Sequence, residues 1–174
     1  MRNLKLLLCV AFFSIFFIAA SSYAADVAKI GVVNSQQLLK TSKAGKKIAT
    51  DINKLGKQME ADLIKRKAEI DELKKSFESQ AMVLSKEGLE KKRRDIQVKT
   101  LDFRSEQEKY RSKLQQENQK KMIQFRKDLD KVLAELGKKE GYLMILDKMM
   151  VLYHPGSTDL TDKVIKLFDA KYAK

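Results

Sequence analysis

The chain has 174 residues, a net charge of +13, one cysteine and one histidine. A single cysteine excludes a disulfide within the chain. One cysteine and one histidine are also too few for the usual zinc or haem ligand sets, so we expect no cofactor. The positive charge favours anionic partners or surfaces.

Residues 1–24 have the three-part pattern of a secretory signal peptide. The basic start MRNLK is followed by an apolar run over 6–20, and small residues at Ser22 and Ala24 precede the expected cut. This run is shorter than the roughly 20 residues that a membrane-spanning helix needs, although an uncleaved anchor is the alternative. Because Cys9 lies inside the run, we expect no lipoprotein anchor. The pattern predicts export, to the periplasm if the cell has two membranes.

The segment VAKIGVV at residues 27–33 is the first predicted strand, since β-branched residues between turn-like neighbours favour a strand. Nearly every position is apolar, rather than every second one. We therefore expect this strand to be buried on both faces.

Residues 48–136 have the composition of long helices: 39 of these 89 residues are charged, 31 are apolar and none is proline. Apolar residues recur at helical spacing in two series, from Ile48 to Phe77 and from Leu89 to Leu136. Each series makes a narrow stripe, which favours coiled-coil-like pairing of two helices over burial in a globule. Spacing nearer 3.6 than 3.5 residues predicts nearly straight helices.

The segment SQAMVLSKEGLEKKRRD separates the two series and predicts a reversal near residues 79–87. Ser85 is a suitable N-cap for the second helix, and Glu87 then lies in its first turn. The result is an antiparallel hairpin about 70 Å long, with the apolar AMVL turn exposed at its tip; the alternative is one continuous rod. Polar residues interrupt the second stripe, so the hairpin should be firm at its root and loose toward its tip.

Two more strands are predicted near the C-terminus, YLMIL at 142–146 and MMVLY at 149–153, joined by a tight turn at Asp147–Lys148. The segment STDLTDKVIKLFDAKY follows as a helix that opens with the capping residues Thr158 and Asp159. Its apolar face consists of Leu160, Val164, Ile165 and Phe168.

Residues 25–47 and 137–174 together make a small body of 61 residues. A body of this size is marginal by itself, and its strands need cover on both faces. We therefore expect the body to oligomerise through its strands. The number of subunits does not follow from this argument.

In this order, the signal peptide, KIGVVNSQQLL, the charged hairpin, GYLMILDKMMVLY and DLTDKVIKLF resemble the Skp/OmpH family of periplasmic chaperones. The most specific matches are IGVVNS at 30–35, the ILD…VLY segment and DLTDKVIK at 159–166. The resemblance implies a homotrimer whose three bodies join and whose three hairpins surround a cavity. It also implies an ATP-independent holdase for unfolded outer-membrane β-barrel proteins. The basic residues of the lipopolysaccharide site proposed for the family have no clean match in this chain.

The sequence thus predicts an α+β fold. A small β-rich trimerisation body comes from residues 25–47 and 137–174, and a long antiparallel helical hairpin comes from residues 48–136. With the trimer that the resemblance implies, side chains of the three body strands form the trimer core. These are Ile30, Val32, Leu143, Ile145, Val151 and Tyr153.

The hairpin offers two kinds of contact to an unfolded chain or a surface. Apolar residues at the tip or off the two stripes are client-contact candidates, unless they merely widen the seam between the helices. They are Ile64, Met82, Val83, Leu84, Val98, Leu101 and Ile123. A basic run is the candidate for anionic lipid or lipopolysaccharide, unless its charges only cover solvated helix faces. It consists of Lys91, Lys92, Arg93 and Arg94.

Other classes of function fit less well. Nucleic-acid binding suits the net charge, but the hairpin mixes 22 basic with 17 acidic residues and has no groove-reading motif. A structural spacer between layers of the cell envelope is the main alternative, and it requires a continuous rod. A catalytic centre would start from His154 with Ser157 and Thr158, yet these residues suit turn and capping chemistry. We expect neither an enzyme nor a nucleic-acid partner.

Overall fold

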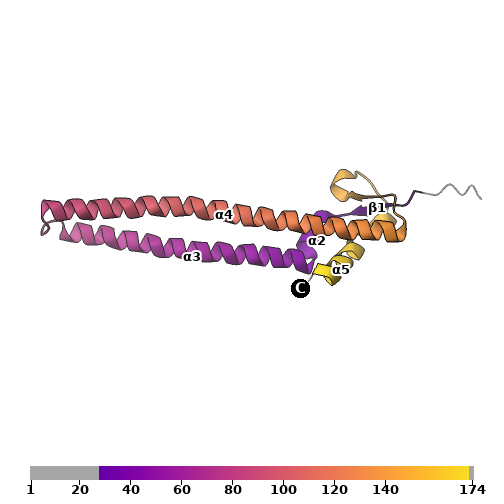
Figure 1. Cartoon of the computed structure of the whole chain (residues 1–174), viewed down its shortest axis with the longest axis horizontal. Helices are drawn as coiled ribbons and strands as arrows, with labels where there is room; N and C mark the ends of the chain where they lie inside the picture. Colours follow the sequence, from indigo (N-terminus) through magenta and orange to yellow (C-terminus); the bar gives the residue numbers. More distant parts are fainter. Residues whose placement is uncertain (1–27, 173–174) are drawn as a thin grey trace, which may run out of the picture.

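The computed structural model describes residues 28–172 as a long helical hairpin with a small α+β body at one end (Figure 1). The predicted signal peptide, residues 1–24, lies outside the described residues. The elements in chain order are β1 (Ile30–Val33), α2 (Ser35–Thr41), α3 (Lys43–Gln80), α4 (Lys86–Glu140), β2 (Met144–Asp147), the 3-10 turns Lys148–Met150 and Gly156–Thr158, and α5 (Thr161–Tyr172). The predicted α+β class with a long helical hairpin is confirmed.

Helices α3 and α4 run antiparallel, side by side, and reverse between Gln80 and Lys86 at the end farthest from the body (Figure 1). The hydroxyl of Ser85 accepts a hydrogen bond from the Gly88 amide at 3.2 Å, so this serine is the N-cap that the sequence predicts. The alternative of one continuous rod is therefore wrong. Within residues 28–172, no helix is both long enough and apolar enough to cross a membrane.

Helix α4 has 55 residues against 38 in α3, and its extra length passes along the body. Four of the nine buried core residues lie in its last five turns, and β1, α2 and α5 close over them. Core residues from α4 are Phe125, Leu129, Val132 and Leu136, and those from the other elements are Val33, Leu38, Leu160, Val164 and Phe168. The α5 members belong to the apolar face that the sequence predicts for this helix.

The arm outside this core is thinly packed. Met59 and Ile70 are buried in the seam between α3 and α4, whereas most other stripe residues are only half-buried. The arm is therefore less buried than the root, where the core lies, and the looser packing toward the tip stays a prediction.

Two glycines are required by the backbone of the body. Gly141 ends α4 with φ at 71°, in the left-handed region that favours glycine. A Cβ added at Gly45 would lie 1.8 Å from the carbonyl oxygen of Leu39, so this glycine lets α3 start directly against α2. The hydroxyl of Ser42, fully buried, caps α3 by accepting from the Gly45 amide at 3.0 Å.

The sheet has two parallel strands, with Ile30 opposite Met144 and Val33 opposite Asp147. The predicted strand at 149–153 is wrong, and so is its tight-turn hairpin with 142–146. The carboxylate of Asp147 accepts from the Met149 amide at 3.0 Å and bends the chain into a 3-10 turn. No third strand of the described chain lies beside residues 149–153 to pair with their backbone.

Burial on both faces holds for β1 but not for β2. Val32 and Val33 are buried, whereas along β2 exposed residues alternate with half-buried ones. A continuous apolar run predicts burial on both faces of a strand. Within a single chain, one face of β2 therefore lacks the cover that its sequence predicts.

The predicted start of the last helix needs a correction. Thr158 belongs to the preceding 3-10 turn, where its hydroxyl donates to the Pro155 carbonyl at 2.8 Å. Asp159 does cap the helix, since its carboxylate accepts from the Thr161 amide at 2.9 Å.

Candidate functional site

Six of the seven client-contact candidates are exposed on the hairpin, and one is not. Leu84 is half-buried, and its side chain lies over Gly88 at the start of α4. At the tip, by contrast, the side chains of Met82 and Val83 are 99% and 83% exposed. The exposed candidates do not widen the seam, because a seam residue would be covered by the opposite helix. They are Ile64, Met82, Val83, Val98, Leu101 and Ile123.

Three of these residues lie in one row on α4. At about 100° per residue, Val98, Leu101 and Ile123 fall within an arc of roughly 60°. Phe125 and Leu129, which are buried, point to roughly the opposite side of the same helix. The row therefore faces away from the packed side of α4, and is open to a partner.

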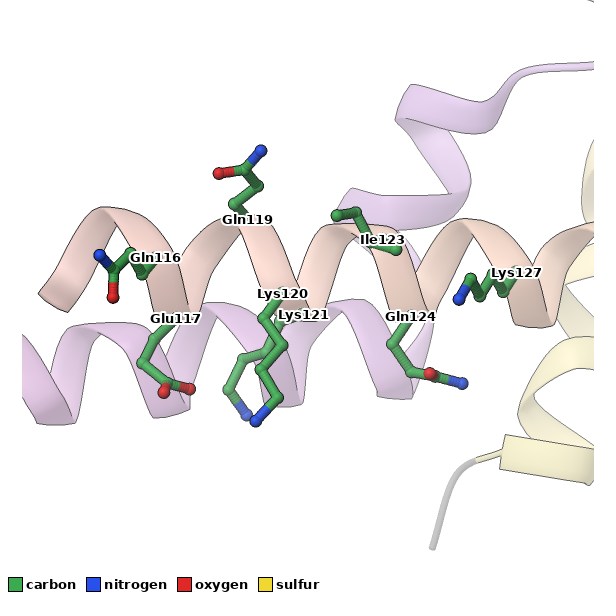
Figure 2. A pocket seen from close by; sticks show the side chains of 8 residues that line it. All are labelled: Gln116, Glu117, Gln119, Lys120, Lys121, Ile123, Gln124 and Lys127. Atoms are coloured by element: carbon green, nitrogen blue, oxygen red, sulfur yellow. The ribbon is translucent and has the colours of Figure 1, made fainter. Parts of the chain in front are cut away.

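Ile123 belongs to a shallow hollow on the surface of α4 (Figure 2). The other residues that line the hollow are glutamine, glutamate and lysine, with Glu117, Lys120 and Lys121 among them. Figure 2 shows Glu117, Lys120, Lys121 and Gln124 pointing to one side of the helix and Gln119 to the other. An open hollow lined by long polar side chains and one apolar side chain suits weak and varied contacts better than tight binding of one ligand.

The basic run near the tip is only partly available to a partner. The Lys92 amine is half-buried and donates to Gln80 at 2.6 Å and to Ser76 at 3.2 Å, which ties α4 to α3. Arg93 lies 3.6 Å from Glu90. The two exposed cations that remain from the predicted set are Lys91 and Arg94.

The six predicted trimer-core residues are divided between the inside and the outside of the chain. Val32 is 2% exposed, and Ile145 is half-buried against the core, with its Cδ1 near Gly137. Val151 is half-buried. The three that lie on the surface are Ile30, Leu143 and Tyr153.

The body exposes further apolar side chains that the prediction missed. In β2 the outward positions are 144 and 146, and the following turn and loop add three more residues. They are Met144, Leu146, Met149, Met150 and Leu152. Their apolar character was visible in the sequence, but choosing between alternate strand positions required the register of β2. An exposed apolar patch of this density is typical of an interaction surface.

His154 lies in a turn and not in a cluster of reactive groups. Its Nδ1 is 3.3 Å from the Thr158 hydroxyl and 3.2 Å from the Pro155 carbonyl oxygen. Among residues 28–172, no group of three or more histidine, cysteine or acidic side chains is arranged to hold a metal ion.

Charged groups join the root of the hairpin to the body. Glu140 at the end of α4 forms ion pairs with Lys163 of α5 and with Lys29 before β1. The hydrogen bond from Lys163 is the main reason why the pKa of Glu140 lies below its usual value. These pairs fix both ends of the body to the helix that carries the arm.

Together these features define a class of protein: a small α+β body that carries one long, largely solvated helical hairpin, with apolar side chains exposed on both. The chain belongs to the OmpH-like outer membrane protein family, whose model matches residues 29–168. The family resemblance predicted from the sequence is thereby confirmed.

Two related proteins support this assignment. A Skp-like protein of Chlamydia muridarum (strain MoPn / Nigg) is 26% identical over 145 residues, which cover 82% of this chain and 84% of the relative. The crystal structure of a candidate outer membrane chaperone (OmpH-like) from Caulobacter crescentus CB15 matches with a TM-score of 0.81 at 16% identity. That match covers 88% of this chain and 91% of the other, and it shows a shared fold.

Proposed function

We propose that the protein is an ATP-independent holdase chaperone of the periplasm. It binds unfolded outer-membrane β-barrel proteins between helical arms and prevents their aggregation. The observation that carries this proposal is the set of exposed apolar side chains, Ile64, Met82, Val83, Val98, Leu101 and Ile123, on a hairpin that is otherwise charged.

Several features support a holding role. Scattered apolar residues on solvated helices give many weak contacts, which retain an unfolded chain without selecting one conformation. The surrounding charges keep the complex soluble. The name of the Caulobacter relative, an outer membrane chaperone candidate, agrees with the client class. No catalytic or nucleotide-dependent step is part of this proposal.

The proposed working form is a homotrimer. The exposed apolar side chains of the body, from Leu143 to Tyr153, supply the surface through which three copies join. Three arms then extend from one assembled body and surround a client. Residues 1–24 direct export and are removed.

An anionic lipid or lipopolysaccharide surface is a second proposed partner. Lys91 and Arg94 are the exposed cations that would contact it beside the apolar tip residues Met82 and Val83. The spacer alternative is less favoured, because it needs a continuous rod and the chain folds back at residues 81–85.

The decisive experiment is an aggregation assay with the purified protein. An outer-membrane β-barrel protein is diluted from urea, without nucleotide, and light scattering is followed with and without a several-fold molar excess of trimer. We expect scattering to be suppressed. Unchanged scattering at that excess would reject the holdase. A soluble cytoplasmic protein that refolds unaided serves as the control client.

A further inference from the structure

Three polar ties cross the seam between α3 and α4 at different heights. Near the tip the Lys92 amine donates to Gln80 at 2.6 Å. In the middle the Tyr110 hydroxyl donates to Asp62 at 2.7 Å, and near the root the Lys121 amine donates to Asp51 at 2.9 Å. The two partners of each tie lie 12, 48 and 70 residues apart along the chain, from the tip to the root.

All three ties fit the same alignment of the two helices. The residue numbers of each pair, Gln80 with Lys92, Asp62 with Tyr110 and Asp51 with Lys121, add up to 172. In an antiparallel pair, a constant sum means a single register. The Lys92 amine also donates to Ser76 at 3.2 Å, a pair that adds up to 168, so the tip tie fits two neighbouring registers and the middle and root ties are the ones that single out one pairing.

The apolar stripe cannot select this register by itself. Its residues repeat about once per helical turn, so sliding one helix by one turn, about 5.4 Å, again sets apolar residues against apolar ones. The stripe is also thin along the arm, so the packing lost in a slide is small. A seam of this kind needs polar contacts to fix its alignment, as polar core residues do in coiled coils.

At the two lower ties, a one-turn slide is unfavourable in both directions. In one direction, the slide sets Glu106 opposite Asp62 and Glu117 opposite Asp51. In the other direction, it sets Leu114 opposite Asp62 and Phe125 opposite Asp51. One direction brings two carboxylates together, and the other sets a carboxylate against an apolar side chain and leaves it without its donor.

We propose that the three ties are a register lock for the arm. The lock determines which residues form the turn and keeps Met82 and Val83 at the tip. It also fixes the height of the exposed row Val98, Leu101 and Ile123 relative to α3. This inference does not depend on what the arm binds.

The middle tie is reinforced within the lock. Asp62 Oδ2 also accepts from Arg66 Nε at 2.6 Å. Arg66 takes a position in the α3 stripe where an apolar residue would otherwise stand. The guanidinium thus holds the Asp62 carboxylate in place for the Tyr110 hydroxyl of the other helix.

A distance measurement tests the lock. Spin labels are attached to cysteines introduced at the exposed positions Lys57 and Asp95 of the chain that starts at residue 25, which has no other cysteine, and the labelled chain is diluted into excess unlabelled chain. The measured distance then joins the two labels of a single hairpin and runs along its length. The tie variant is Lys92→Gln with Tyr110→Phe and Lys121→Gln. We expect one narrow distance in the parent and a second population displaced by about 5 Å in the tie variant.

The matched control removes three charges of α4 that pair within that helix. Its substitutions are Arg93→Gln, Lys109→Gln and Arg111→Gln, whose partners are Glu90, Glu106 and Glu108. The control should keep the parental distance. A tie variant that keeps the single parental distance, or a control that broadens equally, would overturn the lock.

A charge exchange decides the question if the tie variant loses its helical circular dichroism. With Tyr110→Phe and Lys121→Gln present, Gln80→Lys alone should broaden the distance distribution, because it sets two ammonium groups against each other at the tip tie. Adding Lys92→Glu makes an ion pair with position 80 only in the native register, since a one-turn slide sets position 80 opposite Gly88 or Ile96. The two together should therefore restore the single distance. An exchange variant that behaves like either half alone would also overturn the proposal.

Discussion

Asp62 accepts hydrogen bonds from both helices of the hairpin, from Arg66 Nε within α3 and from the Tyr110 hydroxyl of α4. Arg66 first, and then Tyr110, lower the pKa of Asp62 in the folded chain. A carboxyl group whose pKa is lowered by folding stabilises the fold at pH values above its unfolded pKa of about 3.9. This contribution is lost as the pH falls through the lower, folded value.

Asp62→Asn should therefore weaken the arm at neutral pH and reduce its acid sensitivity. We expect the thermal midpoint at pH 7 to drop by a few degrees at most, because the group is solvated. Between pH 5 and pH 3 the parent should lose more stability than the variant. Circular dichroism melts at both pH values measure this, and Glu69→Gln, an exposed carboxylate of α3, is the control. Equal losses in parent and variant would contradict the role of Asp62.

Single residues of the hairpin differ in how far the sequence predicts them. The N-cap Ser85 and the stripe members Met59 and Ile70 follow from local pattern, because spacing and capping act within a few residues. The contact of Tyr110 with Asp62 does not, since it joins positions 48 residues apart and depends on where the turn falls. Arg66 visibly interrupts the first stripe, but the spacing does not show that it pairs with Asp62.

At the level of elements, β2 shows why the sequence does not tell which positions of an apolar run face inward and which face outward. An apolar run has the same sequence pattern whether it is buried by its own chain or by another chain. Ile145 points to the chain's own core, whereas Met144 and Leu146 point outward. The strand expected at 149–153 failed for a related reason, since no strand of the described chain lies next to it.

Leu146→Asp should dissociate the proposed trimer without unfolding the body, because the residue is exposed in the single chain. A charge on a surface that becomes buried by assembly is strongly unfavourable. Light scattering should report the mass of one subunit, with helical circular dichroism unchanged. A variant that keeps its assembled mass would place the interface elsewhere.

Ile145→Asp is the matched comparison on the opposite face of β2. It faces the core beside Gly137, so we expect it to lower the free energy of unfolding of the chain itself by about 2–5 kcal/mol. Urea unfolding of the two variants separates the faces. Equal destabilisation by both would contradict the inward and outward assignment.

The apolar row on α4 predicts a loss of holding without a loss of fold. Val98→Gln, Leu101→Gln and Ile123→Gln each remove about 1 kcal/mol of apolar burial against a client, or about fivefold in affinity per contact used. The triple variant should need severalfold more protein to suppress client aggregation. Its thermal midpoint should stay within about 2 °C of the parent, because these residues are exposed.

A polar triple on the same side of α4 controls for nonspecific effects. Ser105→Ala, Ser112→Ala and Gln119→Ala leave the apolar row intact and should suppress aggregation as well as the parent does. If both triples behave alike, the row is not the surface that holds clients.

For the whole molecule, the two ends have different packing. The core lies where α4 passes the body, with the Phe168 ring packed at a tilt between those of Phe125 and Tyr172 at centroid distances of 5.0 and 5.1 Å. The opposite end is a solvated helix pair with an exposed turn (Figure 1). Overall shape and this gradient follow from composition and stripe width, both of which the sequence displays. The alignment of the two helices does not, because it depends on the cross-seam contacts.

The separation of body and arm predicts that the arm can be shortened without loss of assembly. Deleting residues 60–113 and joining Met59 to Leu114 through a four-residue Gly/Ser loop cuts both helices at nearly the same height, since Gly56 lies opposite Leu114. The α3 arm then shrinks from about 57 Å to about 25 Å, and the body and its core remain complete. The short protein should keep the assembled mass and lose suppression of client aggregation. Loss of assembly would mean that the arms hold the subunits together, and undiminished suppression would move the client surface from the arms to the body.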